Sequence, residues 1–272
     1  MTQQTHMTDP GALARNRNRA TPEGLFLHHA AADEIEDRLQ MVNKAFPNQA
    51  VVTGFPDLWS KRLADAQMVA DSDLLDLPCA PYDLIVHAMS LHWANDPVGQ
   101  IIQCRRALRA DGLFLSMSFG GQTLHELRAC LGQAEAEVSG GLSPRVAPMA
   151  ELRDIGALLQ RAGLALPVAD ALPFSVVYDD MWHLMRDLRA MGETNALYQR
   201  LKRMTGRRVL ERAAQLYREA FSTPNGKITA TFDLTFLTGW APDDSQPKPL
   251  RPGSAQQRLA DALGTGETKL PN

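Results

Sequence analysis

The chain has 272 residues, of which 44% are hydrophobic and 22% charged, and its formal net charge is -3. This size suits one large α/β domain with its own core. The small net charge excludes a broad attraction to nucleic acid, and no apolar run approaches the roughly 20 residues of a membrane helix. We therefore expect a protein that neither binds nucleic acid nor inserts into a membrane.

The N-terminal residues 1–26 carry no hydrophobic signal core, and we expect them to form a flexible arm. Their arginines have two interpretations, a solvated face or a docking surface for an acidic partner. The three cysteines, Cys79, Cys104 and Cys130, are widely spaced and lack the spacing of zinc ligands or of a disulfide framework. Such cysteines are typical of a reducing compartment, and we predict a cytoplasmic location.

Strands and helices are expected to alternate through the first half of the chain. A helix over 27–44 precedes them, with apolar residues at helical spacing. The later segments are strands at 49–52, 67–70, 82–88 and 112–119, and helices at 57–66 and 98–109. This alternation predicts a mostly parallel sheet with helices on both faces.

Helices dominate the expected second half. Apolar stripes predict helices after Gly121, over 154–162, over 181–191 and over 208–221, so that 122–222 is expected to be a helical insertion. Apolar and polar residues alternate over 230–236, which predicts a strand with one face more exposed to solvent. The main domain is expected over 27–241, and 242–272 as a loose tail.

The segment AVVTGFPDLWSKRL, residues 50–63, has the pattern of the first βα turn of a nucleotide-binding fold. Such turns contain several glycines, because the backbone must approach the ligand closely. Here Gly54 is alone, and Phe55 and Pro56 follow it. Phe55 adds bulk, and Pro56 removes a backbone donor.

Family resemblance begins with YDLIVHAMSLHWANDPVGQIIQCRRALRADGLFLSMSFGG, residues 82–121. This segment resembles the second half of a class I S-adenosylmethionine-dependent methyltransferase. More specifically, the chain resembles the complex I assembly factor 5 group, relatives of malonyl-carrier-protein methyltransferases. The segments that carry this resemblance are FGGQTLHELRACLGQAEAEVSGGLSPRVAPM, MRDLRAMGETNA, YREAFSTPNGKITATFDLTFLTGW and PLRPGSA.

The resemblance implies a Rossmann-like α/β fold with a seven-stranded, mostly parallel sheet whose last strand is antiparallel. It implies S-adenosylmethionine at the carboxyl ends of the first strands, and an acidic residue ending the second strand to bind the ribose. It further implies a protein substrate in respiratory complex I, where hydroxylation of an arginine is the activity attributed to the group.

Two features depart from that pattern. The loop keeps only Gly54, and the stretch from Gly54 to Asp83 has the length of a single βαβ unit, about 30 residues. We therefore expect a fold shortened by one strand–helix unit. If strand 67–70 is the third of the family, the second strand and its ribose-binding acid are missing, and Asp71 or Asp73 either takes over the ribose or is a solvated loop carboxylate.

Other candidate site residues follow the strand at 82–88. Ser90 is assigned to the cofactor site, His92 to catalysis and Trp93 to substrate binding, against the alternative that His92 simply packs beside Trp93. His87 lies inside the apolar strand, where core packing is favoured.

The next strand ends at Gly120 and Gly121, with Thr123 close behind. Their backbone N–H groups are candidates to hold an anion or a peptide carboxylate, unless they only form a tight turn. Residues 126–128 resemble the ELR of the family, and this resemblance makes Glu126 the second catalytic candidate, which would pair with a substrate guanidinium. The alternative is a plain helix charge. No His/carboxylate spacing predicts an iron site.

Three functions remain open on the sequence. The first is a complex I assembly factor 5-like protein with a degenerate cofactor site that modifies an arginine or assists assembly. The second is an active S-adenosylmethionine-dependent methyltransferase. The third is a non-catalytic assembly chaperone.

Overall fold

The computed structural model describes residues 6–78, 82–247, 261 and 264–266. The chain divides into two units, 1–242 and 243–272. The tail predicted over 242–272 corresponds to the second unit, but most of it lies outside the described residues, as does Cys79. The sheet and the helices that cover it belong to the first unit.

The first unit contains both helices and strands along its described length. Its helices are α1 (Pro10–Arg17), α2 (Phe26–Met41), α3 (Pro56–Arg62), α4 (Pro97–Ala107), α5 (His125–Ser139), α6 (Leu152–Arg161), α7 (Met181–Ala190) and α8 (Arg207–Phe221), with short 3-10 turns η1 (Pro22–Leu25) and η2 (Leu91–Trp93). Its strands are β1 (Gln49–Thr53), β2 (Gln67–Ala70), β3 (Tyr82–Ala88), β4 (Leu108–Gly120), β5 (Ala165–Tyr178) and β6 (Ile228–Trp240).

These strands form one sheet of six in the order β2-β1-β3-β4-β6-β5. β1 to β4 pair in parallel, whereas β6 is antiparallel to both β4 and β5. The mostly parallel sheet with an antiparallel last strand is therefore confirmed. Six strands replace the seven of the family pattern, and the described part of 71–81 contains no helix, so the shortened fold is confirmed as well.

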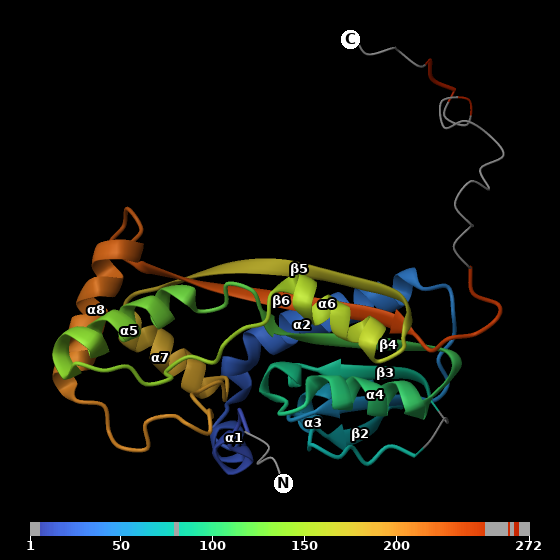
Figure 1. Ribbon diagram of the computed structural model, residues 1–272, viewed down its shortest axis with the longest axis horizontal. Coiled ribbons are helices and arrows are strands. Elements are labelled where there is room, and N and C mark those ends of the chain that lie inside the picture. The colour runs from blue at the N-terminus through green and yellow to red at the C-terminus, as the bar shows by residue number, and fades with distance from the viewer. Residues whose placement is uncertain (1–5, 79–81, 248–260, 262–263, 267–272) are drawn as a thin grey trace. The chain divides into compact units, whose positions relative to one another are not determined.

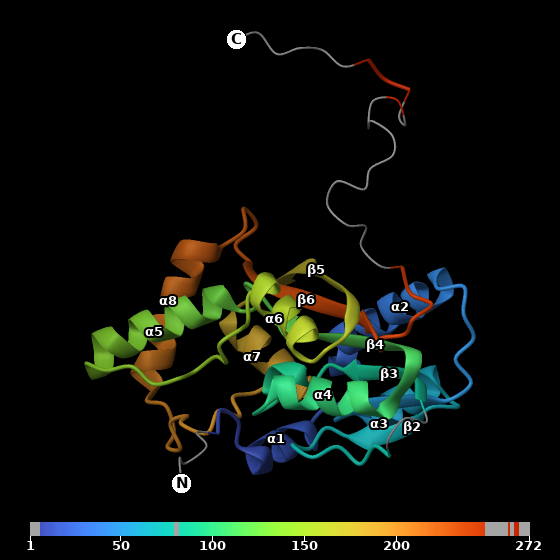
Figure 2. The same ribbon diagram turned by 45° about the vertical axis from the view of Figure 1, so that its right-hand side comes forward.

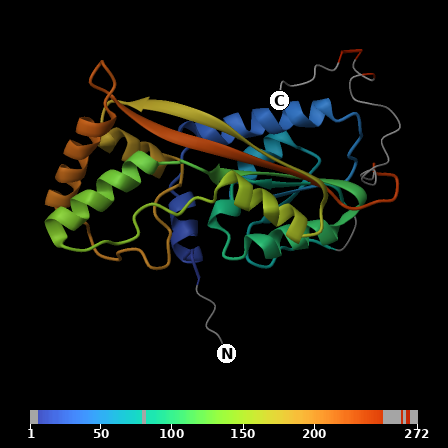
Figure 3. The same cartoon turned by 45° about the horizontal axis from the view of Figure 1, so that its top comes forward.

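Helices cover both faces of the sheet because its strand residues alternate in direction. On one face Val51 and Val86 pack into a cluster that includes α2 and α3. On the other, Val52 and Ile85 pack with α4 and α6. Figure 3 shows α2 along one side of the sheet with α4 and α6 on the other.

Beyond the parallel strands, β5 and β6 extend to a second group of helices. α5 and α8 lie side by side there, with α7 close to both (Figure 1). Tyr217 of α8 is fully buried in the same cluster as Phe232 of β6. This helical group and the sheet therefore share one core.

The position of β2 corrects the predicted strand alignment. β1, α3 and β2 form a βαβ unit, and β2 pairs directly and in parallel with β1. A strand that follows the first through one helix and lies beside it takes the place of the second strand. Asp71 therefore ends the second strand, and the missing strand is the outer one.

Two further expectations are wrong. Residues 122–222 are not a purely helical insertion, because β5 crosses this range and forms the outer edge of the sheet. Residues 10–25 are not a flexible arm, since α1 and η1 occupy them and Ala12 and Leu13 are buried. In the described part of the chain, no helix has the length and apolar character to span a membrane.

Candidate functional site

The carboxyl ends of β1, β2, β3 and β4 meet at one edge of the sheet, where open α/β folds bind ligands. β2 and β3 lie on opposite sides of β1, so the topological switch point is at the end of β1. Figure 2 shows α1 next to this part of the molecule. The site has two regions, which we call the cofactor end and the pocket.

The cofactor end, formed by Gly54, Phe55 and Asp71, holds a side chain of the same chain. Nη1 of Arg17 donates to Oδ1 of Asp71 at 2.8 Å, and Nη2 lies 2.7 Å from Oδ2. The two side chains are only 10% and 12% exposed. The guanidinium carbon also lies 5.7 Å from the ring centre of Phe55. The first contact is a hydrogen bond, and the second is an ion-pair contact without hydrogen-bond geometry.

Arg17 also fills the space over Gly54. A Cβ atom placed on Gly54 would lie 2.3 Å from the guanidinium carbon of Arg17. Bound S-adenosylmethionine would need this space and would need an oxygen of Asp71 for its ribose. Arg17 occupies both, so the cofactor end does not fit S-adenosylmethionine in this conformation.

The other two predicted cofactor residues lie apart from that ion pair. Asp73 is exposed in the loop after β2. Ser90 is buried, and its hydroxyl lies 3.3 Å from Nδ1 of His87, whose Nε2 contacts Gln100 at 2.8 Å. Burial lowers the pKa of His87. Ser90 and His87 therefore form a buried polar pair inside the fold, as core packing predicts for His87.

His92 and Trp93 converge on Glu193, a carboxylate that no sequence pattern assigned to the site. Trp93 Nε1 donates to Glu193 Oε2 at 2.7 Å, and His92 Nε2 lies 3.2 Å from the same oxygen. His92 also packs edge-on against Phe119, with ring centres 5.1 Å apart. The two residues are thus held by one acceptor from a segment a hundred positions away.

The Glu193 carboxylate is buried but remains charged. Its side chain is 5% exposed, and burial alone would raise its pKa. His92, which is also its hydrogen-bond partner, and Arg17 outweigh that effect and lower the pKa of Glu193 below its ordinary value. Among the described residues, Glu193 Oε1 has no hydrogen-bond partner.

His28 of α2 lies on the other side of this carboxylate. Its Nε2 is 4.0 Å from Glu193 Oε1, too far for a hydrogen bond, and its ring meets Phe55 edge-on at 4.5 Å. Complete burial lowers the pKa of His28 to about 4, so the ring is neutral at pH 7. At pH 7 His28 therefore adds no positive charge beside Glu193.

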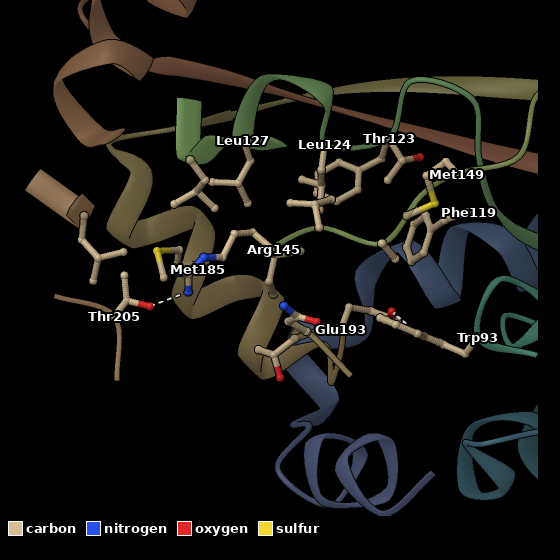
Figure 4. Close-up of a pocket in the computed structure, with 18 residues that line it drawn as sticks. Trp93, Phe119, Thr123, Leu124, Leu127, Arg145, Met149, Met185, Glu193 and Thr205 are labelled. Atoms are coloured by element: carbon tan, nitrogen blue, oxygen red, sulfur yellow. Dashed lines mark hydrogen bonds between the residues drawn. The ribbon is translucent and has the colours of Figure 1, made fainter. Parts of the chain in front are cut away.

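Beside Trp93 and Glu193 lies the pocket, a cavity of about 250 Å³. Its walls come mainly from α5, α7, α8 and the loop before α6, and they are largely apolar (Figure 4). Besides Trp93 and Glu193, the lining includes Phe119, Thr123, Leu124, Leu127, Arg145, Met149, Met185, Thr205 and Phe232. Enclosed apolar cavities with a few polar groups are typical of sites for organic ligands.

Arg145, the cation in the pocket wall, has its own partners. Its Nη2 lies 2.6 Å from Glu135 Oε1, and its Nη1 donates to Thr205 Oγ1 at 2.6 Å. The carboxylate of Glu193 and the guanidinium of Arg145 are thus held by different groups within one cavity.

The predicted anion site at Gly120 and Gly121 is not available for binding. The N–H of Gly121 donates to Ala150 O at 2.9 Å, and Gln122 N donates to Asp233 Oδ2 at 2.7 Å. A tight turn explains these glycines. Thr123 does line the pocket, although its hydroxyl donates to Gly120 O at 2.7 Å.

The carboxylate of Glu126 also accepts its hydrogen bonds from another part of the fold. Its oxygens accept from the hydroxyl of Thr231 at 2.6 Å and from the N–H of the same residue at 3.2 Å. Glu126 therefore joins α5 to β6 and is not part of the pocket lining. Glu193, and not Glu126, is the carboxylate that lines the pocket.

The N-terminal segment and the Glu193 segment hold each other in place. Asn16 Nδ2 donates to Thr194 O at 2.9 Å, and Thr8 forms a β-bridge with Leu197. Asp9 caps α1 through Ala12 N at 3.0 Å and pairs with Arg200 at 2.9 Å. α1 therefore reaches the cofactor end through Arg17 and the pocket through its contacts with residues 194–200.

No group of three or more His, Cys, Asp or Glu side chains within the described ranges is arranged to hold a metal ion. The adjacent His28 and His29 point apart, as expected on a helix, since His28 is buried and His29 is exposed. No cluster of ligands forms around Asp33 in the described part of the chain.

Comparison with known proteins links the chain to two groups. Arginine-hydroxylase NDUFAF5 of Rattus norvegicus is 35% identical over 95% of this chain and 69% of its own length. The same protein of Danio rerio is 37% identical over 74% of this chain, which spans only 62% of that relative. Malonyl-[acyl-carrier protein] O-methyltransferase of Methylovorus sp. (strain MP688) is 35% identical over 64% of this chain and 56% of its own length.

No family model matches the chain. Among solved structures, a putative methyltransferase from Bacillus halodurans C-125 covers 76% of this chain and 98% of its own, with 10% identity and a TM-score of 0.49.

Proposed function

Because this chain belongs to the NDUFAF5 family, whose matched members are named arginine-hydroxylases, we propose that it acts on an arginine side chain of a protein partner. The partner that the family resemblance implies is a subunit of respiratory complex I. The supporting observation is the contrast within the site, where Arg17 fills the cofactor end and the pocket beside Trp93 and Glu193 is open.

The chain's own residues have distinct parts in this function. The apolar walls of the pocket exclude water from an entering side chain. Trp93 and His92 orient the Glu193 carboxylate through its Oε2 atom. No step is assigned to S-adenosylmethionine, because Arg17 occupies the space and the carboxylate that the cofactor would need. The cytoplasmic location remains a prediction, since the relatives are named mitochondrial.

A test in the organism of origin separates modification from assembly alone. The gene is deleted, complex I subunits are isolated, and their arginine-containing peptides are compared by mass spectrometry with those of the parent strain. We expect one arginine to lose its modification and to regain it with the wild-type gene. Loss of assembled complex I with every subunit modification intact would instead identify a non-catalytic chaperone.

Methyltransferase activity is the second candidate, and one observation favours it. Asp71 ends the second strand, where the family places its ribose-binding acid. Titration calorimetry with S-adenosylmethionine and S-adenosylhomocysteine tests this function. We expect no binding to the wild type at millimolar ligand. Micromolar binding would support the methyltransferase, and binding only to Arg17→Ala would mean that Arg17 closes a usable cofactor site.

A further inference from the structure

Positive charge is concentrated just before α8, in a chain whose net charge is negative. The run KRMTGRR, residues 202–208, contains four cations and no carboxylate, whereas the whole chain has a formal net charge of -3. It covers the loop before α8 and the start of that helix. The four cationic side chains are all exposed, and we call them the basic surface: Lys202, Arg203, Arg207 and Arg208.

The stability of the fold does not account for this charge. No hydrogen bond or ion pair joins Arg203 or Arg208 to another residue within the described ranges. Arg207 pairs with Glu211, but these side chains are 89% and 52% exposed, and such surface pairs contribute little. The first turn of α8 has no acidic residue, and cations there oppose the helix dipole. The basic surface is therefore available to a partner.

The basic surface borders a hollow and not a flat face. A second cavity, of about 480 Å³, has Arg203, Arg207 and Arg208 in its lining, together with residues near the C-terminal end of α5. Met204 also lines this cavity and is 96% exposed. Figure 1 shows the loop before α8 below α5 and α8, on the side away from β5. Arginine clusters are a recurring means of recognising acidic peptide motifs, and a concave lining suits a chain segment better than the plane of a membrane.

The second cavity adjoins the pocket. Arg145 and Thr205 line both cavities, and Arg145 Nη1 donates to Thr205 Oγ1 at 2.6 Å (Figure 4). This hydrogen bond fixes the loop that carries the basic surface to the wall of the pocket. A segment bound on the basic surface would therefore lie beside the pocket.

We propose that the basic surface docks an acidic segment of the partner protein, with carboxylates on Arg203 and Arg208 and an apolar side chain against Met204. This inference rests on the proposed function and adds to it the chemistry that recognises the partner. A nucleic acid fits less well, because the rest of the chain carries an excess of carboxylates that repels a phosphate backbone.

The test uses the full chain and two fluorescein-labelled peptides, Gly-Glu-Asp-Leu-Glu-Asp-Gly and its analogue with Gln and Asn in place of Glu and Asp. Fluorescence anisotropy follows each titration. We expect the acidic peptide to bind the wild type, and the neutral peptide to bind at least about fivefold more weakly. Binding of the acidic peptide should weaken as salt rises from about 50 to about 500 mM, because exposed charges are then screened.

A double variant and a matched control locate the binding. Arg203→Gln/Arg208→Gln removes two cations of the basic surface and should weaken the acidic peptide about fivefold or more, through the loss of two ion pairs. Arg153→Gln/Arg161→Gln makes the same change in net charge at exposed positions of α6 and should bind like the wild type. Thermal unfolding checks that both variants are folded. In the deletion strain, the gene of the double variant should restore less arginine modification than the gene of the control.

Three results would overturn the inference. The first is a wild type that does not distinguish the two peptides. The second is a control variant that loses as much affinity, or restores as little modification, as the double variant. The third is binding of phosphatidylserine vesicles through Arg203 and Arg208 without binding of the acidic peptide.

Failure of the proposed function looks different. In that case the deletion strain keeps every arginine modification, while the acidic peptide still binds in a way that depends on Arg203 and Arg208.

Discussion

The cofactor end and the pocket lie at the same edge of the sheet and are joined by α1, yet the first is filled by a side chain of the protein and the second is not. At the cofactor end a guanidinium of the chain itself fills the space over Gly54 and forms an ion pair with Asp71. In the pocket a cavity of about 250 Å³ remains, and an oxygen of Glu193 has no partner in the described chain.

Under the proposed function, this difference lets one fold keep a substrate site while the chain itself occupies the cofactor end. The acid at the end of the second strand is present, and its partner is the N-terminal helix. The Asp71–Arg17 pair serves the stability of the fold. Changes at the cofactor end should therefore affect stability, and changes in the pocket should affect binding.

The largest effect is expected for Asp71→Ala. This change removes the carboxylate from the Arg17 side chain, which is only 10% exposed in the intact protein. Breaking a buried ion pair costs about 3–5 kcal/mol. Urea unfolding should show this loss, with Asp73→Ala as the matched control. Asp73 is exposed, so its change should stay within about 0.5 kcal/mol. Equal effects of the two changes would mean that Arg17 does not close the cofactor end.

Together with His87, whose pKa burial also lowers, His28 between the two regions should contribute to the loss of stability in mild acid. Its pKa is about 4 in the folded state and near 6.5 in the unfolded chain, so only the unfolded chain takes up the proton between these values. Above pH 6.5 the ring is neutral in both states and His28 does not lower the free energy of unfolding. As the pH drops to 4, the free energy of unfolding falls by about 3 kcal/mol, at about 1.4 kcal/mol per pKa unit.

Urea unfolding from pH 7.5 to 4 checks this. His28→Leu should flatten the slope, because it removes a ring whose two nitrogens have no partner in the described residues. His29→Gln changes the exposed neighbour and should keep the wild-type slope. A His28→Leu protein with an unchanged slope would contradict the assignment of a neutral His28 beside Glu193.

A smaller cost is expected for Gly54→Ala. The new Cβ would lie 2.3 Å from the Arg17 guanidinium, which must shift, and overpacking of this kind costs about 1–3 kcal/mol. In an Arg17→Ala background the same change should cost less than about 0.5 kcal/mol, because the clash is gone. A double-mutant cycle by urea unfolding measures the coupling. Additive costs would mean that Arg17 does not fill this space.

Much of the fold was predictable from the sequence, because the buried elements carry a clear period. β3 (Tyr82–Ala88) is buried throughout and has an apolar centre at residues 84–86, and α4 and α8 show helical spacing. β5 (Ala165–Tyr178) was missed because it is an edge strand. Most of its side chains are at least partly exposed, and it contains Pro167 and Pro173, so no alternation marks it.

The site was less predictable, because its pairs are far apart in the chain. His92 and Trp93 were identified from their place after β3. Nothing local reveals that they share the carboxylate of Glu193, or that Arg17 meets Asp71 54 positions later. Glu126 was singled out because residues 126–128 resemble the ELR of the family, but the hydroxyl and N–H of Thr231 in β6 take up both of its oxygens.

The smallest effect on stability is expected in the pocket, for Met185→Trp. Met185 is half-buried and lines the cavity, so a larger ring enters space that already exists. The change in unfolding free energy should stay below about 1 kcal/mol, less than a single methyl group costs at Gly54. Urea unfolding of Met185→Trp beside Gly54→Ala measures the two regions in one experiment. If the tryptophan destabilised the protein more than the alanine, the pocket would be as tightly packed as the cofactor end, and the distinction between a closed and an open region would fail.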